Sequence, residues 1–303
     1  MAVIVALLEK SKKFDKESFL NKFNINPSEI RILRGGEEEL LVIHIPDSKK
    51  IDMVELISFD SISKVYDFTK SYKLIHREIK PEGYSIKLKN TEISALTFTP
   101  IISFNIENVN LNEIKVSINK FISKGIKIIY LKNKYILPSD IEFLKKFIDT
   151  LQDVAIIFSI NSPDSIVVAS KYVDAYVIEQ NQMQNFSLLR ALGKTRKPVI
   201  VKKAPAASIE EYLLSVEYII YEGNLNVILC ESGTLTVHNR VIPDIEAILY
   251  MKEKTYLPVL MDIENFETKK EIDHYLKIAR NLELNGIIVD YKELKQNSIN
   301  QIY

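Results

Sequence analysis

The sequence predicts an α/β protein, a (β/α)8 TIM barrel preceded by a small ferredoxin-like α+β domain. Two observations predict the barrel: from about residue 96 onward, short apolar runs alternate with helical stretches, and the connections between them are short. Parallel strands that are covered on both faces read as near-continuous apolar runs of this kind. Eight such strands in alternation with helices favour a closed barrel over an open sheet.

The N-terminal part follows a different pattern. AVIVALL reads as a strand and FDKESFLNKF as a helix, and EIRILRG and LLVIHI read as two strands joined around Gly35 and Gly36, a hairpin signal. A helix at MVELISF and a strand at SKVYDF complete a βαββαβ order, which is typical of the ferredoxin-like arrangement. We assign residues 1–68 to this domain, residues 69–95 to a linker with a hairpin across the barrel base, and residues 96–303 to the barrel.

The barrel strands are expected in the apolar runs 97–104, 126–131, 154–160, 175–178, 198–202, 226–230, 258–262 and 286–290. Two of the intervening helices, SDIEFLKKFIDTL and SIEEYLLSVEYIIY, open with a serine three residues before a glutamate, namely Ser139 before Glu142 and Ser208 before Glu211. This spacing is a capping-box signature, which marks the start of a helix.

Composition narrows the class of protein. Among the 303 residues, 40 basic and 40 acidic side chains cancel, so no basic excess indicates a nucleic-acid partner. The apolar runs are far shorter than the ~20 residues that span a bilayer, so no membrane association is expected. The single cysteine, Cys230, lies in an apolar strand, where a buried and inert thiol is expected, and it fits a reducing cytosol. We therefore expect a cytoplasmic protein.

Three long segments resemble one enzyme family. SYKLIHREIKPE is similar to its PYKLxSREFKPE, NQMQNFSLLRALGKTRKPVIVKK to its ARNMQNFxLLKxxGKxxKPVLLKR, and ASIEEYLLSVEYIIYEGNLNVILCESG to its ATIEEWLxAAEYIxxxGNxNVILCERG. The chain thus resembles, over essentially its whole length, the 3-deoxy-7-phosphoheptulonate (DAHP) synthases that carry an N-terminal ferredoxin-like regulatory domain. The resemblance implies condensation of phosphoenolpyruvate with erythrose 4-phosphate, with a divalent metal, as the first step towards aromatic amino acids.

The metal ligands that the resemblance implies are mostly replaced. Ile101 stands where the family's GPC motif has its cysteine, and Asn265 where its DPSH motif has its histidine. Asp290 stands where the IEVH motif has its glutamate, and the last aspartate ligand falls near Gln301. Two of the four groups that make the family site soft enough for a transition ion are therefore lost. No cofactor is expected; a divalent metal (Mn or Mg) would be needed only if activity is retained, with Asp262 and Asp290 as its ligands.

The phosphate-binding residues also depart from the family. YLKNKYILPSD replaces the family's GGAFKPRTSP loop, and Lys132 and Lys134 would substitute in part, although lysine lacks the bidentate fork of arginine. Asn181 and Ser232 stand where the ARNMQN and CERG motifs have arginine. Each lost charged hydrogen bond costs about 1.5–3 kcal/mol, so normal synthase activity is not expected.

Two family-matched groups remain, Lys202, which corresponds to the lysine that binds phosphoenolpyruvate, and Glu231. Lys202 and Lys203 end the fifth barrel strand, so one should face the barrel mouth and the other should point outward. Lys202 is expected to pair with Glu231 or Glu179 as a residual ancestral lysine. The alternative is an anion-binding or Schiff-base lysine, which would need a lowered pKa.

Five acids cluster at the predicted strand ends: Glu179, Glu231, Asp262, Glu264 and Asp290. They could hold Mg²⁺ or Ca²⁺ through oxygen ligands, but we favour a role in neutralising the lysines and capping loops. His238, which follows the sixth strand, is expected to be a solvated loop residue.

Three functions stay open at this point. In the first, the chain is a catalytically silent relative of DAHP synthase that acts as a regulatory or assembly partner. In the second, it is an enzyme that uses Lys202 on another substrate, such as a metal-free aldolase. In the third, it is an active synthase with a rebuilt site. The first is favoured. The expected partners are further copies of the chain, in a dimer or tetramer, together with an aromatic amino acid as effector or a shikimate-pathway protein.

Overall fold

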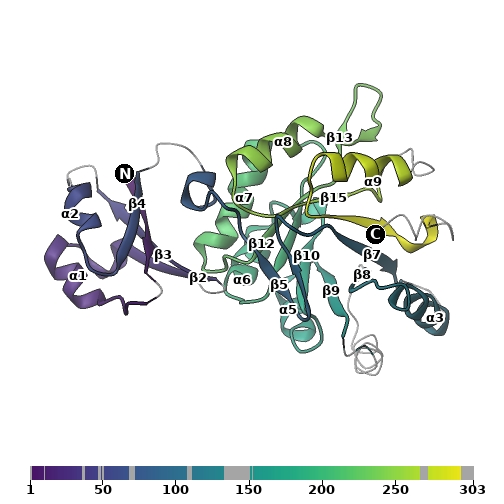
Figure 1. Cartoon of the computed structure of the whole chain (residues 1–303), viewed down its shortest axis with the longest axis horizontal. Helices are drawn as coiled ribbons and strands as arrows, with labels where there is room; N and C mark the ends of the chain where they lie inside the picture. The colour runs from purple at the N-terminus through teal and green to yellow at the C-terminus, as the bar shows by residue number, and fades with distance from the viewer. Residues whose placement is uncertain are drawn as a thin grey trace.

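A small sheet domain lies beside a closed barrel in the computed structural model of the chain (Figure 1). The structure describes residues 2–9, 11–35, 38–46, 49, 51–67, 72–107, 111–132, 151, 153–266 and 272–294.

The N-terminal domain contains β1 (Ala2–Leu8), α1 (Lys16–Phe23), β2 (Ile30–Gly35), β3 (Glu38–Ile45), α2 (Met53–Ile57) and β4 (Ile62–Asp67). Its strands pair antiparallel in the order β2-β3-β1-β4, which confirms the predicted βαββαβ arrangement.

The sheet of this domain is apolar on both faces. Ile4 and Leu41 belong to a core that also contains the aromatic side chains of α1, of which Phe19 is fully buried. Their strand neighbours Val5 and Leu40 point the other way and join the large core that contains the barrel. Because successive strand residues point to opposite faces, this alternation places the helices on one side of the sheet and the barrel on the other.

Contacts from β2 and β3 to helix α7 (Ile209–Tyr221) hold the domain against the barrel. The guanidinium of Arg31 lies 4.2 Å from the ring centre of Tyr221 and donates to the carbonyl oxygen of the same residue at 3.2 Å. The Tyr221 hydroxyl lies 3.3 Å from Nε2 of His44. On the same helix, the Glu217 carboxylate accepts the backbone N–H of Leu74 in the linker.

The predicted hairpin of the linker is formed by β5 (Ile86–Leu88) and β6 (Thr91–Ile93). Lys89, in its turn, donates to the carbonyl oxygens of Leu151 and Val154, both at 3.0 Å, just before a barrel strand begins. Asn285 lies directly before another barrel strand, and its side-chain amide donates to the Ser94 carbonyl oxygen at 2.6 Å. The hairpin therefore lies across the amino-terminal end of the barrel, as expected.

Eight parallel strands close the barrel: β7 (Thr99–Asn105), β8 (Ile128–Lys132), β9 (Ala155–Ile160), β10 (Ala175–Ile178), β11 (Val199–Lys202), β12 (Val227–Glu231), β15 (Val259–Asp262) and β16 (Gly286–Asp290). β16 pairs with β7 to complete the ring. All eight predicted strands are confirmed, and each is completely buried or nearly so.

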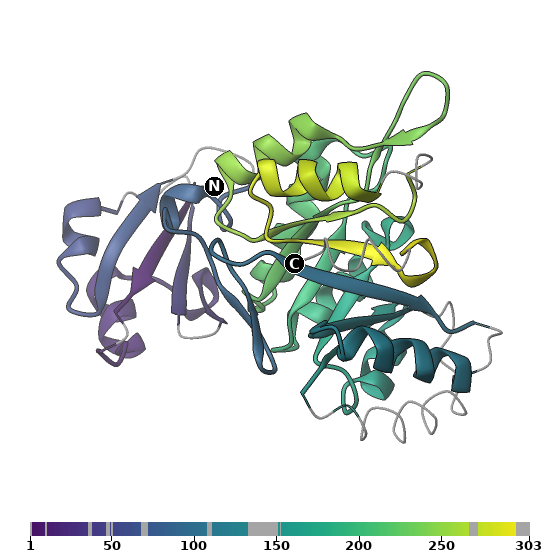
Figure 2. The same ribbon diagram turned by 45° about the vertical axis from the view of Figure 1, so that its right-hand side comes forward.

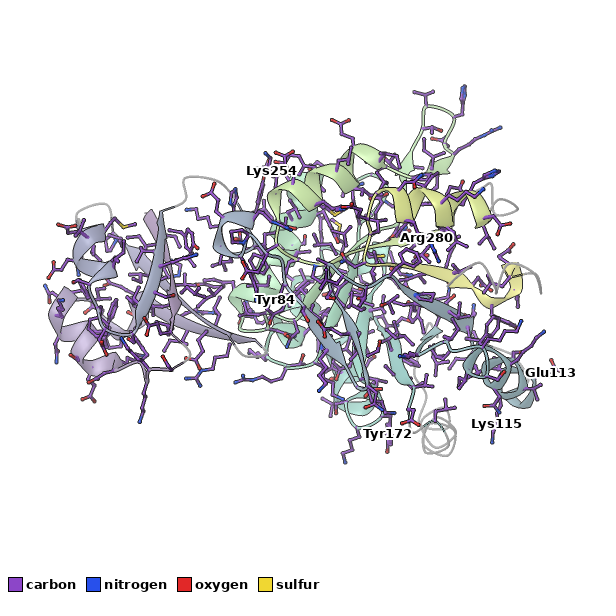
Figure 3. The ribbon with its side chains drawn as sticks, in the orientation of Figure 1. Tyr84, Glu113, Lys115, Tyr172, Lys254 and Arg280 are labelled. Carbon is purple, nitrogen blue, oxygen red and sulfur yellow. The ribbon has the colours of Figure 1, made fainter. Side chains whose placement is uncertain are left out.

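Helices surround this ring: α3 (Leu111–Ile122), α5 (Pro163–Ala169), α6 (Phe186–Gly193), α7, α8 (Ile245–Lys254) and α9 (Ile272–Asn281). Helix α3 buries Ile114 and Ile118 and exposes Glu113 on its outer side (Figure 3). The capping box of α7 is confirmed, since Ser208 and Glu211 each accept the backbone N–H of the other. The helix predicted over residues 139–151 lies almost entirely outside the described residues.

One element had no counterpart in the sequence prediction. β13 (Thr234–Leu235) and β14 (Val241–Ile242) form a hairpin after β12 that projects from the barrel (Figures 1 and 2). His238 lies in its exposed loop, as expected for a solvated residue. Cys230, by contrast, is fully buried in β12 with a free thiol. Within the described residues, no helix is long and apolar enough to span a bilayer.

The buried Glu217 makes the stability of the protein depend on pH. Burial raises the pKa of its carboxyl from 4.5 to about 7. Between these two values the folded state holds more protons than the unfolded state, so the free energy of unfolding falls as the pH rises, by up to about 3 kcal/mol. Glu217→Gln keeps the acceptor for Leu74 but cannot ionise.

We expect Glu217→Gln to be more stable than the wild type by up to about 3 kcal/mol at pH 8, and no more stable at pH 4. Urea denaturation followed by circular dichroism at the two pH values measures this difference. Glu210→Gln, on the exposed first turn of the same helix, is the control. An equal gain in the control, or a gain that does not change with pH, would show that burial of Glu217 is not the cause.

Candidate functional site

A buried lysine lies at the centre of the carboxyl-terminal end of the barrel. Lys202 is the last residue of β11, and its side chain is 1% exposed. Its ammonium nitrogen lies 2.8 Å from Oδ2 of Asp262, 3.1 Å from Oε2 of Glu179 and 3.3 Å from Oε2 of Glu264. Three carboxylates therefore surround one ammonium group.

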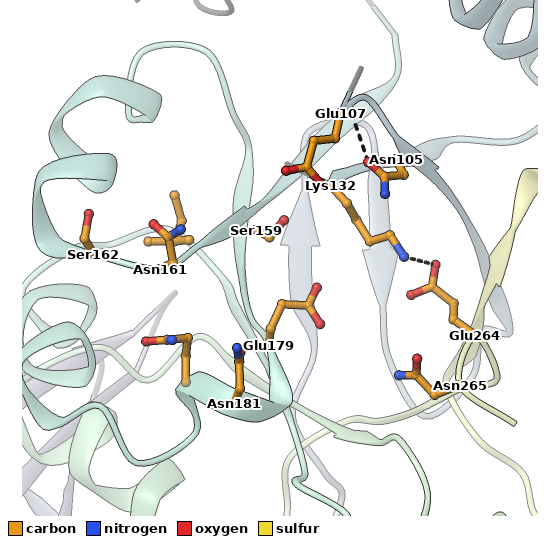
Figure 4. A pocket seen from close by; sticks show the side chains of 12 residues that line it. Asn105, Glu107, Lys132, Ser159, Asn161, Ser162, Glu179, Asn181, Glu264 and Asn265 are labelled. Carbon is orange, nitrogen blue, oxygen red and sulfur yellow. Dashed lines mark hydrogen bonds and ion pairs between the residues drawn. The ribbon is translucent and has the colours of Figure 1, made fainter. Parts of the chain in front are cut away.

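Three further side chains donate to the carboxylates around Lys202. The Lys132 ammonium lies 2.8 Å from Oε1 of Glu264 (Figure 4), and the hydroxyl of Ser103 donates to the same oxygen. The Tyr130 hydroxyl donates to Glu179, and the Tyr130 ring lies 4.9 Å from the Lys202 ammonium. We call these seven residues the Lys202 network: Ser103, Tyr130, Lys132, Glu179, Lys202, Asp262 and Glu264.

The network keeps Lys202 charged although it is buried. Burial disfavours the ammonium form, but the three carboxylates outweigh it and hold the pKa of Lys202 well above its usual value. Burial raises the pKa of Asp262 to about 6, against the opposing effect of Lys202. Burial alone would also raise the pKa of Glu264, but Lys202 and Lys132 together lower this pKa to about 2. Glu264 thus stays ionised to a lower pH than Asp262 does.

Lys203 belongs to a separate cluster. It is 2% exposed, and its ammonium nitrogen lies 3.8 Å from Oδ2 of Asp244, the residue that caps α8. The strand alternation correctly predicted that only one of the two lysines faces the barrel mouth, but Lys203 is covered by the start of α8 and does not reach solvent. Glu231 lies beside it, and its Oε1 accepts the N–H groups of Gly233 at 2.6 Å and Asp244 at 3.3 Å.

Glu231 does not pair with Lys202. Of the two partners that the sequence offered for Lys202, the structure selects Glu179. Both β10 and β12 neighbour β11, but Lys202 is in register with Cys230, so Glu231, one residue further on, faces the other side of the sheet. Burial raises the pKa of Glu231 to about 7, opposed by Lys203. Ser232, at the position of a family arginine, is fully buried and donates to the carbonyl oxygen of Cys230 at 3.5 Å.

A cavity of about 730 Å³ opens above the Lys202 network (Figure 4). It is lined by Asn105, Glu107, Lys132, Ser159, Ile160, Asn161, Ser162, Glu179, Asn181, Gln182, Glu264 and Asn265. Five of these side chains carry neutral amides, three carry carboxylates and one carries an ammonium group. The wall therefore has an excess of negative over positive charge.

The predicted site residues are distributed unevenly around this cavity. Lys132, Asn181 and Asn265 line it, and Lys202 and Asp262 lie beneath it. Asp290 ends β16, and its carboxylate accepts the backbone N–H of Lys292 at 2.8 Å, where it caps a short 3-10 helix (Tyr291–Glu293). The predictions for Lys134 and Gln301 lie outside the described residues.

The side chains present do not fit the metal centre that the resemblance implies. Ile101 is apolar and fully buried in β7, and Asn265 offers a neutral amide in place of an imidazole. Asp262 is paired with Lys202, and in the described parts of the chain no group of three His, Cys, Asp or Glu side chains is arranged to hold a metal ion. Such a donor set lacks the thiolate and imidazole that hold transition ions.

Sequence reasoning missed Tyr130 and Ser103. Both are strand residues whose side chains turn toward Lys202. A signal was present: Tyr130 lies two positions before Lys132, and residues two apart in a strand face the same side.

The fold and the strand-end residues define a (β/α)8 barrel with a polar cavity at the carboxyl ends of its strands. The model of the DAHP synthetase I family matches residues 111–284, more than half of the chain, and the chain belongs to this family.

The relatives agree with this assignment. A phospho-2-dehydro-3-deoxyheptonate aldolase of Thermotoga maritima is 29% identical over 84% of this chain and 79% of its own length. A 2-dehydro-3-deoxyphosphooctonate aldolase of Psychromonas ingrahamii is 28% identical, over only 37% of this chain and 39% of its own length. The crystal structure of the DAHP synthase from Thermotoga maritima superposes with a TM-score of 0.66 at 27% identity, and covers 95% of this chain and 87% of that one.

Removing the charge of Lys202 should destabilise the protein strongly. Lys202→Met leaves three carboxylates without their common counter-ion, and breaking a buried ion pair from one side costs about 3–5 kcal/mol. Urea denaturation at pH 7 measures this loss. In the double variant Lys202→Met/Asp262→Asn, we expect part of it to be restored, because one uncompensated charge has been removed. A loss below about 1 kcal/mol in the single variant would mean that water solvates the pairs.

Proposed function

We propose that this chain is a DAHP synthase family member without normal synthase activity, which acts as a regulatory or assembly partner. The observation that carries the proposal is the neutralisation of Lys202. The lysine that should attract phosphoenolpyruvate is bound on three sides by carboxylates of its own chain.

Charge argues against the family's substrates. The Lys202 network contains two ammonium groups and three carboxylates, and the cavity wall adds a third glutamate, Glu107. Like charges in a confined site of low dielectric repel strongly, so this cavity disfavours two phosphorylated substrates. The arginines that would offset the repulsion are replaced by Asn181 and Ser232.

The metal requirement leads to the same proposal. Because the donor set does not suit a transition ion, we propose that the protein functions without the family's divalent metal.

The lysine-based aldolase is the weaker alternative. A Schiff-base lysine attacks a carbonyl as the neutral amine, so it needs a lowered pKa. The carboxylates around Lys202 shift its pKa in the opposite direction. Its side chain is also only 1% exposed, which limits access of a carbonyl substrate to the nitrogen.

The N-terminal domain supports the regulatory or assembly role. It packs through Arg31 and His44 on the outer helix α7 and does not reach the barrel mouth. A ligand or a partner that binds this domain can therefore act on the barrel from its side without entering the cavity. We propose that the chain forms a dimer or tetramer, and that an aromatic amino acid or a shikimate-pathway protein is its effector.

The test of the proposal is a direct assay. Purified protein is mixed with phosphoenolpyruvate, erythrose 4-phosphate and Mn²⁺, and the loss of phosphoenolpyruvate is followed by its ultraviolet absorbance. The Thermotoga maritima relative is the positive control. We expect no loss above the rate without protein, and no heat of phosphoenolpyruvate binding by calorimetry. Turnover that depends on Mn²⁺ and disappears in Lys202→Met would refute the proposal.

Sedimentation velocity at micromolar concentration tests the assembly. We expect a dimer or a tetramer of the 34.9 kDa chain. A monomer at every concentration would leave the self-association without support.

A further inference from the structure

We propose that the barrel mouth contains a latent oxyanion site and that the side chain of Glu264 is the anion that occupies it. This inference rests on the proposed function, because it names the residue that keeps anionic ligands out. Glu264 thereby determines the specificity of the cavity.

The surroundings of Glu264 are those of a bound oxyanion. Its Oε1 lies 2.8 Å from the Lys132 ammonium and accepts the Ser103 hydroxyl, and its Oε2 lies 3.3 Å from the Lys202 ammonium. Two cations and one hydroxyl thus converge on a single carboxylate from β7, β8 and β11. Charge-assisted hydrogen bonds of this kind are how proteins commonly hold carboxylates and phosphates.

The carboxylate is placed there by its own chain. Glu264 follows β15 by two residues, and its backbone N–H donates to Oδ1 of Asp262 at 3.0 Å, which fixes the turn. In the family's DPSH motif this position is a serine, which is too short to reach both lysines. A carboxylate held on the same chain competes at a high effective concentration, so a dissolved anion cannot easily displace it.

Changes of pH do not release the site. Lys202 and Lys132 hold the pKa of Glu264 at about 2, so the carboxylate remains ionised throughout the physiological range.

The position is reachable from solvent once it is empty. Glu264 and Lys132 both line the 730 Å³ cavity, and the Lys132 side chain is 24% exposed. A small oxyanion, such as inorganic phosphate or the phosphate of phosphoenolpyruvate, would then meet the same two ammonium groups and the Ser103 hydroxyl.

The experiment is a gain of binding. Inorganic phosphate and phosphoenolpyruvate are titrated at low ionic strength into the wild type, Glu264→Ser and Glu264→Gln by isothermal calorimetry. We expect both variants to bind phosphate at least about tenfold more tightly than the wild type, because Lys132 loses its carboxylate partner and Lys202 loses one of its three, so that both can form a charged hydrogen bond to the anion. The gain should weaken as salt is added.

Two further variants test whether the gain of binding comes from a specific site or only from the loss of one negative charge. Glu107→Gln removes one negative charge from the same cavity and leaves both lysines paired, so its gain should be much smaller than that of the Glu264 variants. Lys132→Ala in the Glu264→Ser background should abolish the gain. Circular dichroism and thermal melting establish that each variant is folded, and the nearly isosteric Glu264→Gln serves if the serine variant does not fold.

The outcomes are distinct from those of the synthase assay. Folded Glu264 variants that bind phosphate no better than the wild type would overturn the inference, as would an equal gain in Glu107→Gln. Wild-type turnover would refute the proposed function, whereas the gain of binding is measured on the variants and does not depend on catalysis.

Discussion

The ion pairs of Lys202 are the interaction on which the carboxyl-terminal end of the barrel depends. An ammonium group that is 1% exposed is stable only with counter-charges close by, and Glu179 supplies one from the end of β10 while Asp262 and Glu264 supply two from the end of β15. Each of these carboxylates would in turn be buried without a partner if Lys202 were removed. The strand ends β10, β11 and β15 are therefore linked by charge as well as by the ladder of backbone hydrogen bonds.

The same pairs show how a barrel of this family can keep its fold while the charges at its mouth change. Stability of the barrel comes from the apolar strands, which retain their pattern, whereas binding of anions depends on a few cations at the strand ends. Here Lys202 is retained, and its charge is neutralised by carboxylates of the same chain. Glu264 reaches Lys202 and Lys132 at once, so a single position both stabilises the mouth and closes it to oxyanions.

The N-terminal domain is connected to the barrel far from this mouth. Arg31, His44 and the linker residue Leu74 all contact the outer helix α7. Helix α7 leads through a short loop into β12, which carries Glu231 and ends beside the Lys203 cluster. On this helix, burial raises the pKa of Glu217, which accepts the backbone N–H of the linker residue Leu74, to about 7. Helix α7 and the strand that follows it thus connect the N-terminal domain with the Lys203 cluster.

The sequence by itself determined the barrel, the βαββαβ domain and the family, because strand and helix periodicities are local and the family segments are long and continuous. It also identified Lys202 and the acids at the strand ends, since parallel strands bring their carboxyl ends to one face. Only the tertiary structure decided which acid pairs with which lysine. Glu264 lies 62 residues from Lys202 and 132 from Lys132, and no local pattern relates them. Their pairing follows from ring closure and the turn after β15, which are consequences of packing across the whole barrel.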